Sequence, residues 1–138
     1  MNAFHYQNGQ LYIENVAISD IAKSVPTPFY VYSQQGIADH FRAFDGAAKK
    51  NLKKSLTCFA VKSNANPSVL KLLAGLGAGA DIVSGGELLL ALKSGIPADK
   101  IVFSGVGKTR EELTLAVEND IKQINVESEE EALMLDEI

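Results

Sequence analysis

The feature that most constrains the fold is an alternation of short β-rich runs with helical patterns from residue 56 onward. Four such runs begin about 22 positions apart: LTCFAV (56–61), GADIV (79–83), KIVFS (100–104) and KQINV (122–126). They are mostly apolar without alternation, which predicts strands covered on both faces. Strand–helix units repeated at this spacing predict a parallel sheet of right-handed βαβ units.

The segments between these runs have the spacing of amphipathic helices. Apolar side chains follow one helix stripe at Val69, Leu72, Leu73 and Leu76. Pro67 after Asn66 suits the first position of a helix. Two further helix starts are predicted by possible capping boxes, Thr109 with Glu112 and Ser128 with Glu131. A leucine-rich repeat would share the period, but its LxxLxL spacing is absent.

The part of the chain before residue 56 follows another pattern. Asn8-Gly9 predicts a small hairpin, TPFYVYS (27–33) predicts a strand, and apolar residues between 37 and 48 predict an amphipathic helix. A closed (β/α)8 barrel needs about 250 residues. Four units therefore predict either a small open α/β sheet or the first half of a barrel.

Composition and charge argue against several classes of function. A net charge of −4 indicates neither nucleic acid nor an anionic membrane as a partner. No apolar run approaches the roughly 18 residues that a membrane span requires. The single cysteine, Cys58, forms no internal disulfide and fits a reducing compartment. We expect a cytoplasmic protein without a metal site, with His5 and His40 solvated and Cys58 a buried thiol.

In parallel α/β folds the functional residues gather where strands end and helices begin. The third run leads to GVGKT (105–109), which partly matches the phosphate-binding pattern GxxxxGK[ST]. The first glycine of that pattern would fall at Val102, so the motif fails at the residue that shapes the loop. We expect Thr109 to cap a helix and Lys108 to be solvated.

The stretch CFAVKSNANP (58–67) ends an apolar run on Lys62. Partial desolvation at the end of a buried strand favours a neutral, nucleophilic amine. Such an amine forms imines with carbonyl compounds, including pyridoxal phosphate. The alternative is a lysine that caps a strand in water, and position alone does not decide between them.

Four segments carry a resemblance to a known family: TPFYVYS, CFAVKSNANPSVLKLLAGLGAGADIVSGGEL, KIVFSGVGKTREEL and INVESEEE. Together they resemble the alanine-racemase-like (fold-type III) pyridoxal-phosphate decarboxylases, which include the ornithine and arginine enzymes. GVGKT favours the branch that acts on diaminopimelate. The resemblance implies that residues 34–138 form the first four units of a TIM (β/α)8 barrel. Residues 1–33 would then contribute strands to a second, β-rich domain.

The resemblance also implies roles for individual residues. Lys62 matches the catalytic lysine that holds pyridoxal 5'-phosphate, and Asp81 matches an orienting acid near the cofactor. Glu87 would support that site, and Asn64 and Ser84 would line it. The implied reaction converts meso-2,6-diaminopimelate to L-lysine and CO2 in lysine biosynthesis, in a homodimer.

Several parts of the family's site have no counterpart in this sequence, among them the glycine-rich phosphate loop and the catalytic cysteine of the second subunit. Cys58 precedes Lys62 and is not that cysteine. We therefore expect these 138 residues alone to be inactive and to aggregate or exchange strands. The alternatives are a decarboxylase for ornithine, arginine or carboxynorspermidine, a non-catalytic fragment that binds pyridoxal phosphate, and an unrelated open α/β binding protein.

Overall fold

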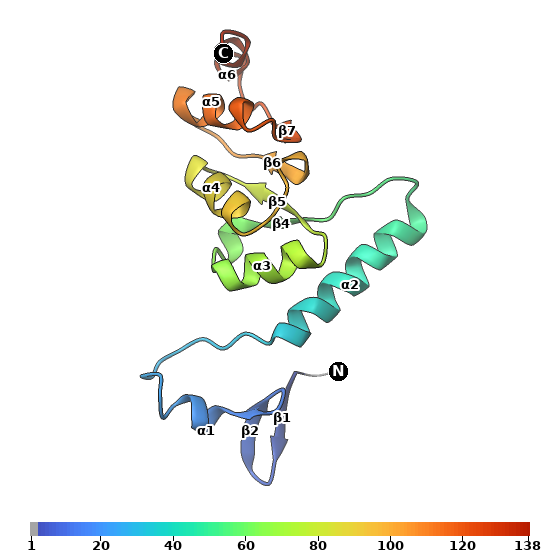
Figure 1. Cartoon of the computed structure of the whole chain (residues 1–138), viewed down its shortest axis with the longest axis vertical. Helices are drawn as coiled ribbons and strands as arrows, with labels where there is room; N and C mark the ends of the chain where they lie inside the picture. The colour runs from blue at the N-terminus through green and yellow to red at the C-terminus, as the bar shows by residue number, and fades with distance from the viewer. Residues whose placement is uncertain (1–2) are drawn as a thin grey trace. The chain divides into compact units, whose positions relative to one another are not determined.

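The computed structural model describes residues 3–138, and Figure 1 shows the order of its elements. The chain divides into two compact units, one ending at Ala47 and the other beginning at Ala48. Among the described residues, no helix is both long and apolar enough to cross a bilayer.

The first unit contains a small antiparallel sheet with the strand order β1-β2-β3. Its elements are β1 (Phe4–Gln7), β2 (Gln10–Ile13), β3 (Val16–Ala17) and the short helix α1 (Ile18–Ile21). Asn8 and Gly9 connect β1 to β2 with φ angles of 51° and 78°. This is the left-handed backbone that an Asn-Gly hairpin turn requires, so the predicted hairpin is confirmed.

The strand predicted at residues 27–33 is wrong, because this segment belongs to neither sheet. Pro26 and Pro28 have no backbone N–H to donate to a ladder, so favourable β-propensity alone does not make a strand. The segment leads instead into α2 (Gln34–Asn51), which contains the predicted amphipathic helix. The Ser33 hydroxyl caps α2 by accepting a hydrogen bond from the Gly36 N–H at 2.7 Å.

The second unit is a four-stranded parallel sheet with helices between its strands, as predicted (Figure 1). The strand order β4-β5-β6-β7 follows the sequence. The strands are β4 (Cys58–Ala60), β5 (Gly79–Ile82), β6 (Ile101–Phe103) and β7 (Gln123–Ile124). The helices are α3 (Pro67–Gly75), α4 (Gly85–Lys93), α5 (Arg110–Glu118) and α6 (Glu129–Asp136), with 3-10 turns η1 (Val61–Ser63) and η2 (Ala98–Lys100).

The two faces of this sheet differ in burial. Ala80, Ile82, Ile101 and Phe103 are fully buried in one apolar cluster with residues of α3, α4 and α5. The opposite face includes Asp81, which is only partly buried in this unit, as are its strand neighbours Ala60 and Val102. The prediction that both faces are covered is therefore wrong for the described unit. The helices of the repeat supply one apolar layer, and that layer is its core.

Gly79 is required by the close approach of two neighbouring strands. A Cβ atom at this position would overlap the backbone carbonyl oxygen of Lys100 and lie 2.8 Å from Cys58 Sγ. We expect Gly79→Ala to lower the free energy of unfolding by about 1–3 kcal/mol, because overpacking forces the backbone to move. Urea denaturation measures this change.

The matched control is Gly75→Ala at the end of α3, where a Cβ would meet no atom within 4 Å. Alanine there is expected to be neutral or to stabilise the protein by about 0.5–1 kcal/mol. Equal effects at the two glycines would contradict the packing explanation.

Candidate active site

The candidate site lies at the carboxyl edge of the parallel sheet, where β4 to β7 all end. Lys62 lies in η1, immediately after β4, and its side chain is exposed. The Ser63 hydroxyl donates to the Ala60 carbonyl at 2.7 Å and stabilises this turn. Within residues 3–138, no hydrogen bond or ion pair engages the Lys62 ammonium group. The structure therefore presents a primary amine at the end of a strand, accessible to solvent.

Asn64 shapes the connection from this lysine to the next helix. Its Oδ1 accepts a hydrogen bond from the Asn66 N–H at 3.1 Å. Asn66 is the N-cap of α3, and its Oδ1 accepts from the Ser68 N–H at 2.9 Å. Pro67 occupies the first turn, as predicted. Two successive asparagine turns thus fix where α3 begins relative to Lys62.

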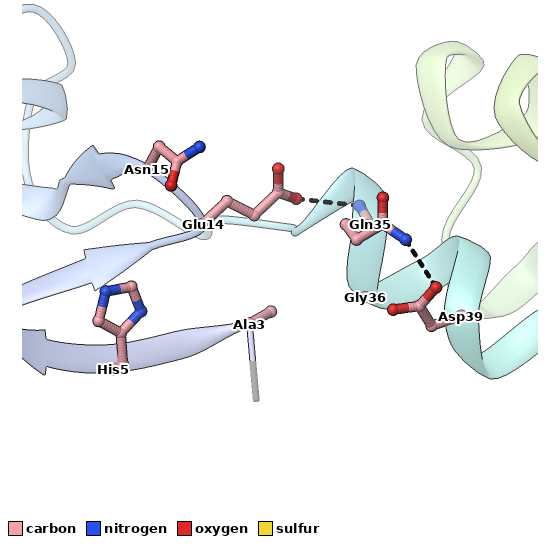
Figure 2. Close-up of a pocket in the computed structure, with 7 residues that line it drawn as sticks. All are labelled: Ala3, His5, Glu14, Asn15, Gln35, Gly36 and Asp39. Carbon is pink, nitrogen blue, oxygen red and sulfur yellow. Dashed lines mark hydrogen bonds between the residues drawn. The ribbon is translucent and has the colours of Figure 1, made fainter. Parts of the chain in front are cut away.

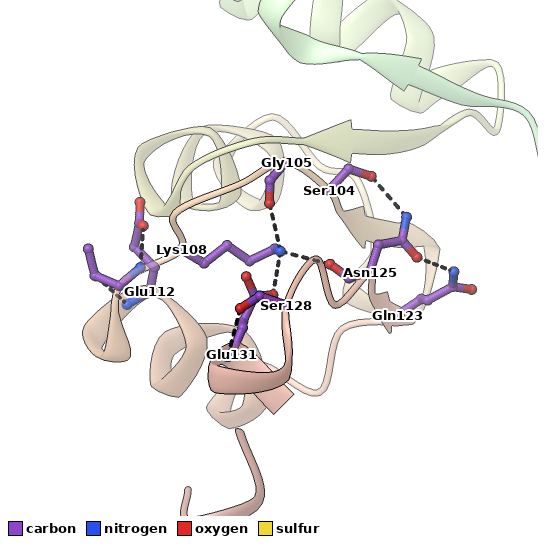
Figure 3. A network of polar contacts seen from close by, with 9 residues as sticks. Ser104, Gly105, Lys108, Glu112, Gln123, Asn125, Ser128 and Glu131 are labelled. Carbon is purple, nitrogen blue, oxygen red and sulfur yellow. Dashed lines mark hydrogen bonds and ion pairs between the residues drawn. The ribbon is translucent and has the colours of Figure 1, made fainter. Parts of the chain in front are cut away.

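Asp81 receives a chain of side-chain hydrogen bonds that crosses three neighbouring strands. Ser104 Oγ donates to Asp81 Oδ1 at 2.8 Å, and Asn125 Nδ2 donates to Ser104 Oγ at 3.0 Å. Gln123 Nε2 donates in turn to Asn125 Oδ1 at 2.6 Å, and Figure 3 shows this end of the chain. We did not predict this chain, although Ser104 and Asn125 are the first residues after β6 and β7.

Ser84 and Glu87 hold the start of α4. Ser84 Oγ accepts from the Glu87 N–H at 3.2 Å, and Glu87 Oε2 accepts from the Val83 N–H at 2.8 Å. The structure thus gives both predicted site residues a capping function beside Asp81. A second carboxylate also holds the start of α4, because Glu112 Oε1 accepts from the Gly85 N–H at 2.8 Å. Glu112 also completes the predicted capping box with Thr109, which is confirmed.

Lys108 is buried, so the prediction that it is solvated is wrong. Its Nζ donates to the carbonyl oxygens of Gly105 and Asn125 at 2.8 and 2.7 Å, and to Glu131 Oε1 at 2.6 Å (Figure 3). Its side chain is 1% exposed, and Nζ lies 5.7 Å from the centre of the Phe103 ring. All three N–H bonds have partners, which offsets the cost of burying the charge.

The second predicted capping box, at Ser128 and Glu131, is only half formed, because the Glu131 carboxylate is engaged by Lys108. Ser128 Oγ accepts from the Glu131 N–H at 3.1 Å. The Glu131 carboxylate, however, pairs with Lys108 instead of returning to the helix N-terminus. A residue with capping spacing therefore serves as the counterion of a buried lysine that lies 23 positions earlier.

Other titratable groups offer little further chemistry. Burial raises the pKa of the Cys58 thiol, the negative charge of Asp81 raises it further, and Lys122 opposes the change. In the first unit His5 stacks on Tyr12, with ring centres 5.6 Å apart, and lines a pocket with Glu14 and Asp39 (Figure 2). Within the described part of the chain, no three His, Cys, Asp or Glu side chains are grouped as metal ligands.

A lysine amine that is exposed at the carboxyl end of a parallel strand can form an imine with an aldehyde cofactor. Comparison with known families supports a cofactor of this class. The family described as "Pyridoxal-dependent decarboxylase, pyridoxal binding domain" matches residues 37–138, and the chain belongs to it.

Individual relatives carry a more specific name. A diaminopimelate decarboxylase of Aquifex aeolicus is 51% identical over 133 residues, which are 96% of this chain and 31% of the relative. One from Pseudomonas fluorescens is 52% identical over 131 residues, 95% of this chain and 31% of the relative. The chain thus spans about a third of the length of these curated relatives.

Solved structures agree with the sequence relatives. The crystal structure of diaminopimelate decarboxylase from Methanocaldococcus jannaschii in complex with L-lysine has a TM-score of 0.94 at 36% identity. The match covers 99% of this chain and 32% of that chain. A crystal structure from Aquifex aeolicus has a TM-score of 0.90 at 50% identity, covering 98% of this chain and 33% of that one.

The ion pair of Lys108 with Glu131 predicts a large effect of substitution. Lys108→Met leaves the Glu131 carboxylate without its counterion, and we expect a loss of about 3–5 kcal/mol in the free energy of unfolding. The double variant Lys108→Met with Glu131→Met is expected to recover much of this loss. Chemical denaturation measures all three proteins.

The control is the exposed ion pair of Arg110 with Glu137, at 2.5 Å. Glu137→Gln should change the free energy of unfolding by at most about 1 kcal/mol, because exposed pairs are weak. A Lys108→Met effect as small as that of Glu137→Gln would show that the buried pair does not stabilise this edge.

The raised pKa of Cys58 predicts slow thiol chemistry in the folded protein. At mildly alkaline pH, iodoacetamide should alkylate native Cys58 more slowly than the same residue in urea, because the thiolate is the nucleophile. The unfolded thiol loses its proton first, so stability should fall as pH rises through the thiol range. Asp81→Asn should lower the pKa of Cys58 and speed alkylation. Equal rates in native protein and in urea would contradict this.

Proposed function

We propose that this chain contributes the cofactor lysine and the first half of the barrel to a pyridoxal-phosphate decarboxylase. Its substrate is meso-2,6-diaminopimelate and its products are L-lysine and CO2. The observation that carries the proposal is the exposed, unpaired amine of Lys62 at the carboxyl end of β4. The names of the relatives support the substrate, and so does the solved relative that was crystallised in complex with L-lysine.

The half-covered sheet supports the barrel assignment. In a (β/α)8 barrel the helices cover the outer face of the strands, and the inner face is filled by side chains from all eight strands. Here α3, α4 and α5 bury one face, while Asp81 and its strand neighbours stay partly exposed on the other. We propose that residues 34–138 are the first four barrel units and that residues 1–33 contribute strands to a second, β-rich domain.

The residues present fit the aldehyde end of the cofactor. Covalent attachment requires a primary amine that is accessible and free of competing partners, and Lys62 meets both conditions. Pyridoxal phosphate, when bound, supplies an electron sink for the charge that remains after a carboxylate leaves. Lys62 would hold it, and Asp81 would orient it from the neighbouring strand. Asn64, Ser84 and Glu87 fix the backbone of the turns around it.

We propose a cytoplasmic homodimer of lysine biosynthesis, since the resemblance in sequence implies a site that is built across two subunits. An assay of CO2 release distinguishes two alternative functions from this one. A decarboxylase for ornithine or arginine would release CO2 from those amino acids, and a non-catalytic binding protein would capture the cofactor without releasing CO2 from any of them.

Cofactor capture tests the role of Lys62 directly. After incubation with pyridoxal phosphate and reduction with borohydride, mass spectrometry should find the cofactor mass on the peptide that contains Lys62. Lys62→Ala should abolish this label in the chain, and CO2 release in the complete decarboxylase, because no other residue supplies the amine at this position. The control is Lys71→Ala on the exposed surface of α3, which should keep both. Undiminished labelling of Lys62→Ala would overturn the proposal.

A further inference from the structure

The hydrogen-bond chain that ends on Asp81 has a single direction. Gln123 Nε2 donates to Asn125 Oδ1, so the amide nitrogen of Asn125 faces the other way and donates to Ser104 Oγ. A serine hydroxyl has only one proton, and that of Ser104 goes to Asp81 Oδ1. Each member thus acts as a donor toward Asp81.

Backbone hydrogen bonds hold Ser104 and Asn125 independently of the hydrogen bonds of their side chains. The Ser104 N–H donates to the Ile82 carbonyl at 2.8 Å, and the Asn125 N–H donates to the Phe103 carbonyl at 2.8 Å. Buried Lys108 holds the Asn125 carbonyl from the other side at 2.7 Å. Ser104 and Asn125 are therefore placed before any ligand arrives, so their hydrogen bonds act on a rigid frame.

The chain leaves one oxygen of Asp81 available. Oδ1 is engaged by Ser104, whereas Oδ2 has no hydrogen-bond partner within residues 3–138. Asp81 pairs in register with Ala60, and β4 ends there and continues directly into the turn that carries Lys62. An acceptor with a fixed orientation thus lies on β5, next to the strand that leads into the turn of Lys62.

We propose that Ser104 and Asn125 are positioning residues that hold the Asp81 carboxylate in one orientation, with Oδ2 directed to an amine at the end of β4. This inference rests on the proposed function of Lys62 and extends it to two residues without an assigned role. Ser104 and Asn125 act on the cofactor lysine only through the orientation of Asp81. Gln123 fixes the orientation of the Asn125 amide and is the outermost member.

The first test measures the rate at which Lys62 captures pyridoxal phosphate in the purified protein at its full natural length, by borohydride trapping. Ser104→Ala is expected to slow capture about tenfold, the size of one lost hydrogen bond to a charged group. Ser104→Thr keeps a hydroxyl and should restore most of the rate. Asn125→Asp replaces the donor by an acceptor and should slow capture at least as much as Ser104→Ala.

The decisive comparison is made in the Asp81→Asn background. If Ser104 acts only through Asp81, Ser104→Ala should cause little further slowing there, whereas independent effects would multiply. The matched control is Thr114→Val, which removes a hydroxyl hydrogen bond to the Arg110 carbonyl on α5, away from the chain. This variant should capture the cofactor at the wild-type rate. Multiplying effects, or a Ser104→Ala rate equal to that of wild type, would overturn the proposal.

A second measurement needs no cofactor and separates the two proposals. The side-chain amide protons of Asn125 should exchange slowly with solvent in the wild type, and faster in Ser104→Ala but not in Thr114→Val. Failure of the wild type to capture the cofactor would overturn the function proposed for Lys62. It would also remove any role of the hydrogen bonds from Ser104 and Asn125 in cofactor capture. Unchanged exchange in Ser104→Ala would overturn the positioning role even where Lys62 captures normally.

Discussion

The register of the parallel sheet is the constraint on which the candidate site depends. Ala60, Asp81, Val102 and Gln123 form one row across the four strands. Lys62 lies two residues after Ala60, in the turn η1 that follows β4. Ser104 and Asn125 lie two residues beyond the row, directly after β6 and β7. Because side chains alternate between the faces of a strand, a shift of one residue in β5 would turn Asp81 into the apolar core. The register thus places the amine and the carboxylate at one edge.

The fold of the second unit could be predicted because its signals are local and repeated. The spacing of the four apolar runs and the caps at Asn66 and Thr109 depend on residues only a few positions apart, and the structure has both. The failed predictions depended on distant partners. Residues 27–33 have the propensity of a strand but pair with neither sheet. Partner strands cannot be inferred from propensity, since pairing is a tertiary property.

Site residues divide in the same way. A motif that is continuous in sequence predicts five residues of the candidate site: Lys62, Asn64, Asp81, Ser84 and Glu87. Ser104 and Asn125 were missed because they join Asp81 only through the register, from 23 and 44 positions later. Lys108 was misjudged for a related reason. A lysine between glycine-rich loop residues suggests exposure, and only the Glu131 carboxylate, supplied by α6, makes its burial favourable.

Two lysines at the same edge of the sheet therefore have opposite physical roles. Lys108 uses all three of its N–H donors on fixed acceptors, so it tethers the loop after β6 to the start of α6 and is inaccessible to a ligand. Lys62 has no hydrogen-bond or ion-pair partner among residues 3–138, and its side chain is exposed rather than partly desolvated as predicted. Lys108 holds the Asn125 carbonyl oxygen, the Asn125 amide donates to Ser104, and the Ser104 hydroxyl donates to Asp81. A buried charge thus orders the edge at which an exposed amine can react.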